Sequence, residues 1–173
     1  MWTGGPLRCV GPLHCTSRGK FGLNAEQMAQ KGCAVLDLTT EFGQRARQRL
    51  TDEPVCWFTT VTPAGQPLSI PIWFLWQADD TVLIYSQDNT PKLRNIRSNP
   101  KVSINLNSND WGGDIIRLHG LAEIPENYPS AAAVQPYVDK YLERMQSMNS
   151  TPESFAAEYS VPILIKPDKL RGF

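Results

Sequence analysis

The chain has 173 residues, of which 41% are hydrophobic and 20% charged, which suits one folded domain and excludes a chain that is disordered throughout. Lys and Arg together number 17, as do Asp and Glu, so the formal net charge is zero and no global basic field exists to collect nucleic acid or anionic lipid. The most apolar run, "IPIWFLW" at 70–76, is far shorter than the roughly 20 residues of a spanning helix, so we expect no membrane-spanning segment.

The cysteines argue against a disulfide framework. Cys9, Cys15 and Cys33 lie at or before residue 33, which leaves only Cys56 in the part that we expect to fold. We therefore expect a reduced, cytoplasmic setting. No metal site is predicted at Cys9, His14 and Cys15, because no second pair of ligands follows at the spacing that zinc sites use.

Residues 1–33 differ from the rest of the chain. Glycines and prolines interrupt any periodicity, basic residues precede the first acid, Glu26, and the apolar stretch of a secretory signal is missing. We interpret the segment as a disordered or non-native extension, with Met28 as an alternative initiator; a targeting extension is the other interpretation. The folded domain is expected at 34–173.

This domain is expected to begin with a helix at 40–50, "TEFGQRARQRL". A threonine can cap it, an acid follows in the first turn, and the arginines gather toward the C-terminal end, as the helix dipole favours. We interpret Arg45, Arg47 and Arg49 as a solvated helix face rather than as a nucleic-acid patch.

Three strands are expected next, at 54–62, 66–76 and 81–86, each rich in β-branched and aromatic residues. The short turns between them, "PAG" and "QADD", predict an antiparallel meander. The later halves are apolar on both faces, which a strand needs when one face lines a barrel and the other meets a helix or a second subunit. Pro71 lies inside the second strand and cannot donate a ladder hydrogen bond, so it predicts an edge, a bulge or a bend.

The second half of the chain predicts a short helix, two strands, further helices and a last strand. Thr90 and Pro91 are typical of a helix start, and Gly120 predicts a bulge in the fifth strand. These elements are expected at 90–98, 101–107, 114–124, 131–148, 152–158 and 160–173. Six strands in antiparallel order favour a mainly β (α+β) fold, a small barrel with peripheral helices.

Sequence motifs identify no catalytic residue. The sequence has no nucleophile elbow, no P-loop and no dinucleotide fingerprint. His119 is the single histidine beyond the N-terminal extension, and its place inside a predicted strand favours a structural role over that of a catalytic base.

The segment 90–101, "TPKLRNIRSNPK", carries four cations and no acid. Lys92 falls in the first helical turn, where a positive side chain costs a few tenths to roughly 1 kcal/mol. An anion bound there would reverse that cost, because the backbone amides, the helix dipole and the ammonium would all face it. The pattern predicts a phosphate site; a solvated basic helix is the alternative.

Three stretches together resemble the FMN-binding split-barrel superfamily, the group of the pyridoxamine-phosphate oxidases and their deazaflavin-dependent relatives. They are "TTVTPAGQPLSIPIWFLW" at 59–76, "VLIYSQDNTPKLRNIRSNPKVSINL" at 82–106 and "GGDIIRLHGLAEI" at 112–124. The tail "FAAEYSVPILIKPDKLRGF" at 155–173 resembles one subgroup, the oxidoreductases that depend on coenzyme F420. The resemblance covers essentially all of 34–173.

The resemblance implies a six-stranded split barrel that forms a homodimer with two cofactors at the subunit interface. The cofactor ring would lie along one strand, the phosphate would bind at the start of the short helix, and an aromatic side chain would reach the ring from the partner. The residues implied for cofactor binding are Ile70, Pro71, Ile72 and Trp73 at the ring, Ser86, Thr90, Lys92, Asn95 and Arg97 toward the phosphate, and Trp111 from the partner.

We therefore expect an oxidoreductase that transfers a hydride between coenzyme F420 and a small organic substrate. An FMN-dependent oxidoreductase of the same fold and a non-enzymatic protein that binds or sequesters flavin or haem are the alternatives. Nucleic-acid binding is not expected. The C-terminal "KPDKLRGF" lacks the basic and aromatic substrate set of the oxidases that act on pyridoxine phosphate, which argues against that substrate.

Overall fold

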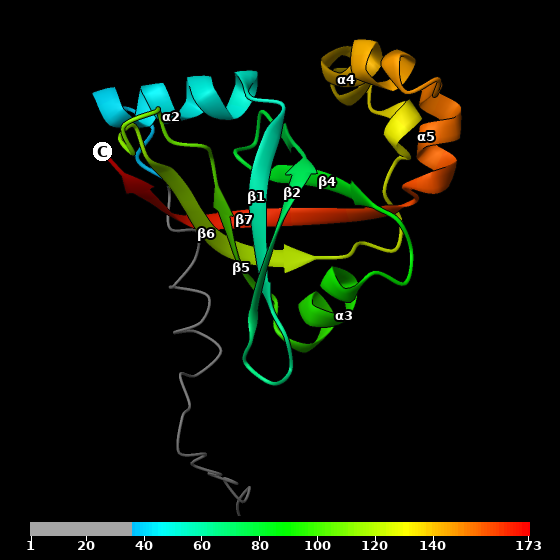
Figure 1. The fold of residues 1–173 in the computed structure, drawn as a ribbon, viewed down its shortest axis with the longest axis horizontal. Coiled ribbons are helices and arrows are strands. Elements are labelled where there is room, and N and C mark those ends of the chain that lie inside the picture. Colours follow the sequence, from blue (N-terminus) through cyan, green and yellow to red (C-terminus); the bar gives the residue numbers. More distant parts are fainter. Residues whose placement is uncertain (1–35) are drawn as a thin grey trace, which may run out of the picture. The chain divides into compact units, whose positions relative to one another are not determined.

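The computed structural model describes residues 36–173 (Figure 1). The predicted extension 1–33, with its three cysteines and Met28, lies outside the described residues. The elements follow in the order α2 (Glu41–Asp52), β1 (Val55–Val61), β2 (Pro67–Trp73), β3 (Leu75–Trp76), β4 (Val82–Ser86), α3 (Pro91–Ser98), β5 (Lys101–Asn105), β6 (Ile116–Glu123), the 3-10 helix η1 (Ala131–Ala133), α4 (Gln135–Ser147), α5 (Pro152–Glu158) and β7 (Val161–Gly172).

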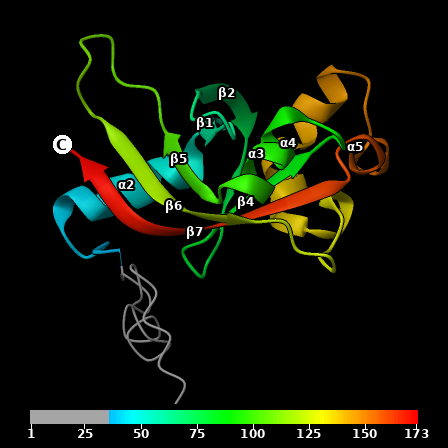
Figure 2. The same ribbon diagram turned by 90° about the horizontal axis from the view of Figure 1, so that it is seen from below.

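The strands form one antiparallel sheet in the order β2-β1-β5-β6-β7-β4-β3. Its two edge strands, β2 and β3, follow each other in the chain with only Phe74 between them. The sheet therefore curls until its edges meet at this residue, which gives the predicted α+β split barrel (Figures 1 and 2). Both views place α2 at one end of the sheet and α4 with α5 at the other.

The sheet has seven strands rather than six, because the predicted strand at 66–76 is divided at Phe74. The Phe74 N–H donates to the hydroxyl of Tyr141, on α4, at 2.8 Å. The same hydroxyl lies 2.6 Å from the Phe74 carbonyl and 2.8 Å from the Pro54 carbonyl, and its one proton serves one of them at a time. A side chain thus takes the place of the ladder partner at the break.

The core consists of two clusters, one on each side of β4. Val82 and Ile84 point into the barrel, whereas Leu83 and Tyr85 point outward to a second cluster under α4 and α5. This explains why all five residues of β4 are buried and confirms the prediction drawn from its apolar faces.

Two local predictions on the strands are confirmed. Pro71 lies on β2, which is an edge strand and pairs only with β1. A proline, which has no N–H to donate, is tolerated in such a strand. The β6–β7 register shifts between His119 and Gly120, and a side chain at Gly120 would clash with the carbonyl of Lys166.

The arginines of α2 are paired rather than simply solvated. Arg45 bonds Asp114 at 3.0 Å, Arg47 bonds Asp80 at 3.1 Å, and Arg49 pairs with both Glu53 and Asp114. These pairs fasten α2 to two loops of the barrel. Among residues 36–173, no helix combines the length and apolar character needed to cross a bilayer.

Loss of the Tyr141 hydroxyl should weaken the barrel closure. We expect Tyr141→Phe to lower the free energy of unfolding by about 1–3 kcal/mol, because the buried N–H of Phe74 loses its acceptor while the ring remains. Urea denaturation followed by far-UV circular dichroism measures this. A midpoint equal to that of the wild type would contradict the role given to the hydroxyl.

Lys140, on α4, makes stability depend on pH. Its ammonium is buried without a hydrogen-bond partner among the described residues and lies 4.3 Å from the centroid of the Phe74 ring. Burial lowers the pKa of Lys140 from 10.5 to about 8, although Cys56, Asp52 and Glu53 oppose the shift. Because the unfolded state then binds more protons between about pH 8 and 10.5, this group makes the protein less stable at pH 7 than at high pH.

We therefore expect Lys140→Met to be more stable than the wild type at pH 7, by on the order of 1 kcal/mol because solvent reaches part of the side chain and screens its charge. The difference between the two proteins should shrink as the pH rises from 8 to 10.5. Thermal melts across this range test it. Since the wild type serves as the reference, the titration of Cys56 largely cancels. A gap that is constant with pH would contradict the assignment.

Candidate functional site

A cleft of about 330 Å³ lies between β2 and β4, which are not paired with each other in the sheet. On the side of β4 that faces away from β7, only the two residues of β3 form a ladder with it. Along Pro67–Trp73, β2 therefore pairs with β1 alone, and its other edge has no ladder partner among the described strands. An unpaired edge offers backbone donors and acceptors to whatever lies beside it. The residues lining the cleft are Ile70, Pro71, Ile72, Trp73, Tyr85, Lys92, Tyr137, Met148, Phe155 and Tyr159.

An aromatic wall fixes one side of the cleft. Trp73 stacks on Tyr141 with ring centroids 4.6 Å apart and planes 2° from parallel, and on Phe155 at 5.4 Å. Phe155 in turn stacks on Tyr159 at 4.5 Å. Trp73 is thus both a packing residue of the second core cluster and part of the cleft, with its ring held in place before any ligand arrives.

Lys92 provides the charge in the cleft. It lies in the first turn of α3, is half-buried, and forms no ion pair with any residue of 36–173. Burial lowers the pKa of the Lys92 ammonium below its ordinary value, because the charged form loses hydration that no acid replaces. The charged form of a lysine in this environment is stabilised when an anion binds beside it.

The start of α3 has no side-chain cap. Thr90 is the N-cap residue and Pro91 follows it, but the Thr90 hydroxyl makes no capping bond. It lies 3.1 Å from the hydroxyl of Ser86, which is 1% exposed and donates to the Gln87 carbonyl at 2.8 Å. The helix start is thereby left without the side-chain acceptor that a threonine normally supplies, next to an unpaired ammonium.

The other predicted site residues lie elsewhere. Asn95 is 4% exposed and its amide donates to the Thr60 hydroxyl at 2.9 Å, which ties α3 to β1. Arg97 is exposed and lines a separate hollow together with Glu123 and Glu126. Trp111 is 95% exposed, on the loop between β5 and β6.

The wall contributed by the C-terminal helices escaped the sequence reasoning. Tyr137, Tyr141 and Met145 recur every four residues and predict one buried helix face. Nothing in that spacing tells which strand the face covers, and Phe155 and Tyr159 give no stronger signal. Their place beside β2 comes from the tertiary fold.

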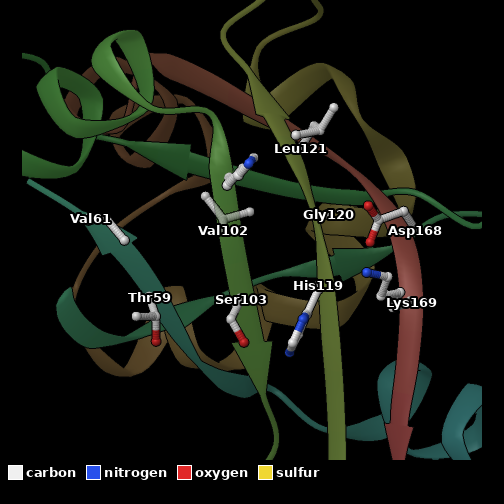
Figure 3. Close-up of a pocket in the computed structure, with 10 residues that line it drawn as sticks. Thr59, Val61, Val102, Ser103, His119, Gly120, Leu121, Asp168 and Lys169 are labelled. Atoms are coloured by element: carbon white, nitrogen blue, oxygen red, sulfur yellow. The ribbon is translucent and has the colours of Figure 1, made fainter. Parts of the chain in front are cut away.

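A larger hollow of about 440 Å³ lies on the outer face of the sheet. Thr59, Ser103 and His119 lie opposite one another on β1, β5 and β6, with Lys169 of β7 next in the row (Figure 3). His119 is therefore outside the cleft. Among the described residues, no group of three or more His, Cys, Asp or Glu side chains could hold a metal ion.

Comparison with known proteins gives one family. The model of a family described as pyridoxamine 5'-phosphate oxidase matches residues 42–171. A search of curated proteins found no match.

Solved structures share the fold. A protein named F420 reductase is 23% identical, with 72% of this chain and 94% of that chain covered and a TM-score of 0.53. The conserved hypothetical protein Rv2991 from Mycobacterium tuberculosis is 19% identical, with coverage of 76% and 82% and a TM-score of 0.61. The heme storage protein HutZ from Vibrio cholerae is 13% identical, with coverage of 75% and 90% and a TM-score of 0.52.

Proposed function

The chain belongs to the pyridoxamine 5'-phosphate oxidase family, and from that membership we propose that its cleft binds coenzyme F420 and that the protein transfers a hydride between this coenzyme and a small organic substrate. FMN is the alternative cofactor. The observation that carries the proposal is the meeting of Lys92 with Ile70–Trp73 in one cleft. The F420 reductase among the structural relatives favours the deazaflavin.

Lys92 holds the cofactor phosphate in this proposal, with Thr90 and Ser86 as hydroxyl partners. The half-buried ammonium without an acid partner and the helix start without a side-chain cap both support an anion at this end of the cleft. Asn95, whose amide is already bonded to Thr60, and the exposed Arg97 are not assigned to the phosphate.

The free edge of β2 receives the ring. Backbone groups along Ile70–Trp73 hydrogen-bond the polar rim of a flat heterocycle, while the stacked wall around Trp73 excludes water from its face. When bound, a deazaflavin supplies hydride chemistry and FMN adds single-electron chemistry; the protein orients and shields the ring. None of the described residues that line the cleft carries a carboxylate or an imidazole, so a proton would come from solvent.

We further assign the exposed Trp111 to the subunit interface of a homodimer. The loop that carries it is organised in the single chain, because Asn109 accepts hydrogen bonds from the backbone of Trp111 and Gly113 at 3.0 and 2.8 Å. Trp57, Leu68 and Leu121 are further large apolar side chains that the single chain leaves exposed. Such side chains are typical of a surface that a partner covers.

A haem-binding role finds less support in the cleft. The relative HutZ is a haem storage protein, but it shares only 13% of its residues with this chain. Met148 lines the cleft, whereas His119, the one histidine in the described part of the chain, lies on the outer sheet face. We therefore keep a phosphorylated flavin or deazaflavin as the proposed cofactor.

Lys92→Met tests the phosphate site. We expect the dissociation constant for F420 or FMN to rise at least about tenfold, because a charge-assisted hydrogen bond is lost. Arg94→Met on the exposed face of α3 is the matched control and should bind as the wild type does. Fluorescence titration with each cofactor gives the constants. Equal affinity of the Lys92 variant would remove the phosphate site, and a wild-type protein that binds neither cofactor below about 100 μM, roughly 5 kcal/mol, would end the proposal.

Trp111→Ala tests the interface. We expect the dimer dissociation constant to rise about tenfold or more, since a tryptophan of this exposure in the free chain is typical of an interface anchor. Sedimentation velocity over a range of protein concentrations measures it. A wild-type protein that sediments as a monomer throughout would contradict the assignment.

A further inference from the structure

The hydroxyl of Tyr137 is a buried donor without an acceptor. Tyr137 lies in the first turn of α4, and its side chain is fully buried. Among residues 36–173, no side chain or backbone group accepts a hydrogen bond from its hydroxyl. Buried polar groups nearly always find a partner, and one that does not costs free energy in the folded protein.

Packing prevents this hydroxyl from turning to water. The Tyr137 ring meets Tyr85 edge-on with centroids 5.1 Å apart, and it contacts Tyr141 at 4.8 Å and Phe155 at 6.1 Å. Rings on three sides hold its position. Burial also raises the pKa of the Tyr137 hydroxyl, so it stays protonated and acts as a donor.

Three other tyrosines of this region have hydrogen-bonded hydroxyls, in contrast to Tyr137. Tyr85 donates to the Pro129 carbonyl at 2.6 Å, Tyr141 bonds the backbone of Phe74, and Tyr128 donates to Gln77 at 2.9 Å. Of these four residues, Tyr137 and Tyr85 line the cleft. The residue that carries the unpartnered hydroxyl therefore also lines the cavity to which the cofactor is assigned.

The lining limits what can approach this wall. Tyr85 and Phe155 pack against Tyr137, and Met148 also lines the cleft. Among the described residues that line it, Lys92 alone is charged, and it is assigned to the phosphate. An ionic group next to the aromatic wall would lose its hydration without gaining a counter-ion. An uncharged, flat ring with a carbonyl oxygen would stack on the wall and supply the missing acceptor.

We propose that the Tyr137 hydroxyl donates a hydrogen bond to a carbonyl oxygen of an uncharged ring bound in the cleft, and that it selects for such ligands. This inference rests on the proposed function. The carbonyl belongs either to the ring of the cofactor or to a conjugated ketone bound against it. The chemistry that Tyr137 recognises is the same in both cases, and the two sources are separated by experiment.

Tyr137→Phe removes the hydroxyl and keeps the ring. In the ligand-free protein it should raise the melting temperature by about 3 °C, because an unsatisfied buried group disappears. The variant should also bind the ligand that accepts the hydrogen bond about tenfold more weakly than the wild type does. Tyr128→Phe is the matched control: it loses a bonded hydroxyl outside the cleft, so it should melt at a lower temperature and bind as the wild type does.

Two titrations identify the carbonyl. The first measures the dissociation constants of FMN and F420 for the free protein by fluorescence. The second measures that of 2-cyclohexen-1-one for the cofactor-loaded protein by quenching of the same signal. Weaker binding in the first titration assigns the carbonyl to the cofactor, and weaker binding in the second alone assigns it to the ketone.

The outcomes separate this inference from the proposed function. A wild-type protein that binds neither cofactor overturns the proposed function and this inference with it. A wild type that binds a cofactor, with unchanged constants for Tyr137→Phe in both titrations, overturns the role of Tyr137 alone. A ligand-free Tyr137→Phe that melts below the wild type also overturns it, because its hydroxyl would then have a partner in the free protein.

Discussion

The contact between Phe74 and the hydroxyl of Tyr141 governs the rest of the structure. At this residue the chain leaves one edge of the sheet and joins the other, so both backbone groups of Phe74 need a partner that no strand supplies. A hydroxyl that accepts and donates can serve both sides of the break. Because the barrel closes at this point and not along the whole of β2, the remaining length of β2 diverges from β4 and leaves the cleft.

Helix α4 concentrates the polar chemistry of this side of the barrel. Tyr137, Lys140 and Tyr141 are three and four residues apart, so they share one helix face. Tyr141 is fully bonded, whereas the hydroxyl of Tyr137 and the ammonium of Lys140 are buried without partners in the described structure. Such groups lower stability, and a protein that keeps them is expected to use some of them. Of these two residues only Tyr137 lines the cleft, so it is the one for which we propose a ligand as partner.

Much of the fold followed from local sequence patterns. Alternating β-branched residues, turn glycines and prolines, and the threonine and proline at the start of α3 predicted the α-helices and strands to within a few residues, except that β2 and β3 were predicted as one strand. The strand count of seven did not follow, since 66–76 reads as one apolar run and the break at Phe74 depends on Tyr141, which lies 67 residues further along the chain.

The sequence by itself determined that Lys92 lies at a helix start and that Ile70–Trp73 lies in a strand, because both features depend on residues that are neighbours in the chain. It determined Trp111 only as part of a loop. The tertiary structure alone decided that Lys92 faces the same cleft as Ile70–Trp73, that Asn95 turns to Thr60, and that the aromatic residues of α4 and α5 close the wall. Contacts between distant segments depend on how the barrel curls and where its edges meet, and no local pattern encodes that geometry.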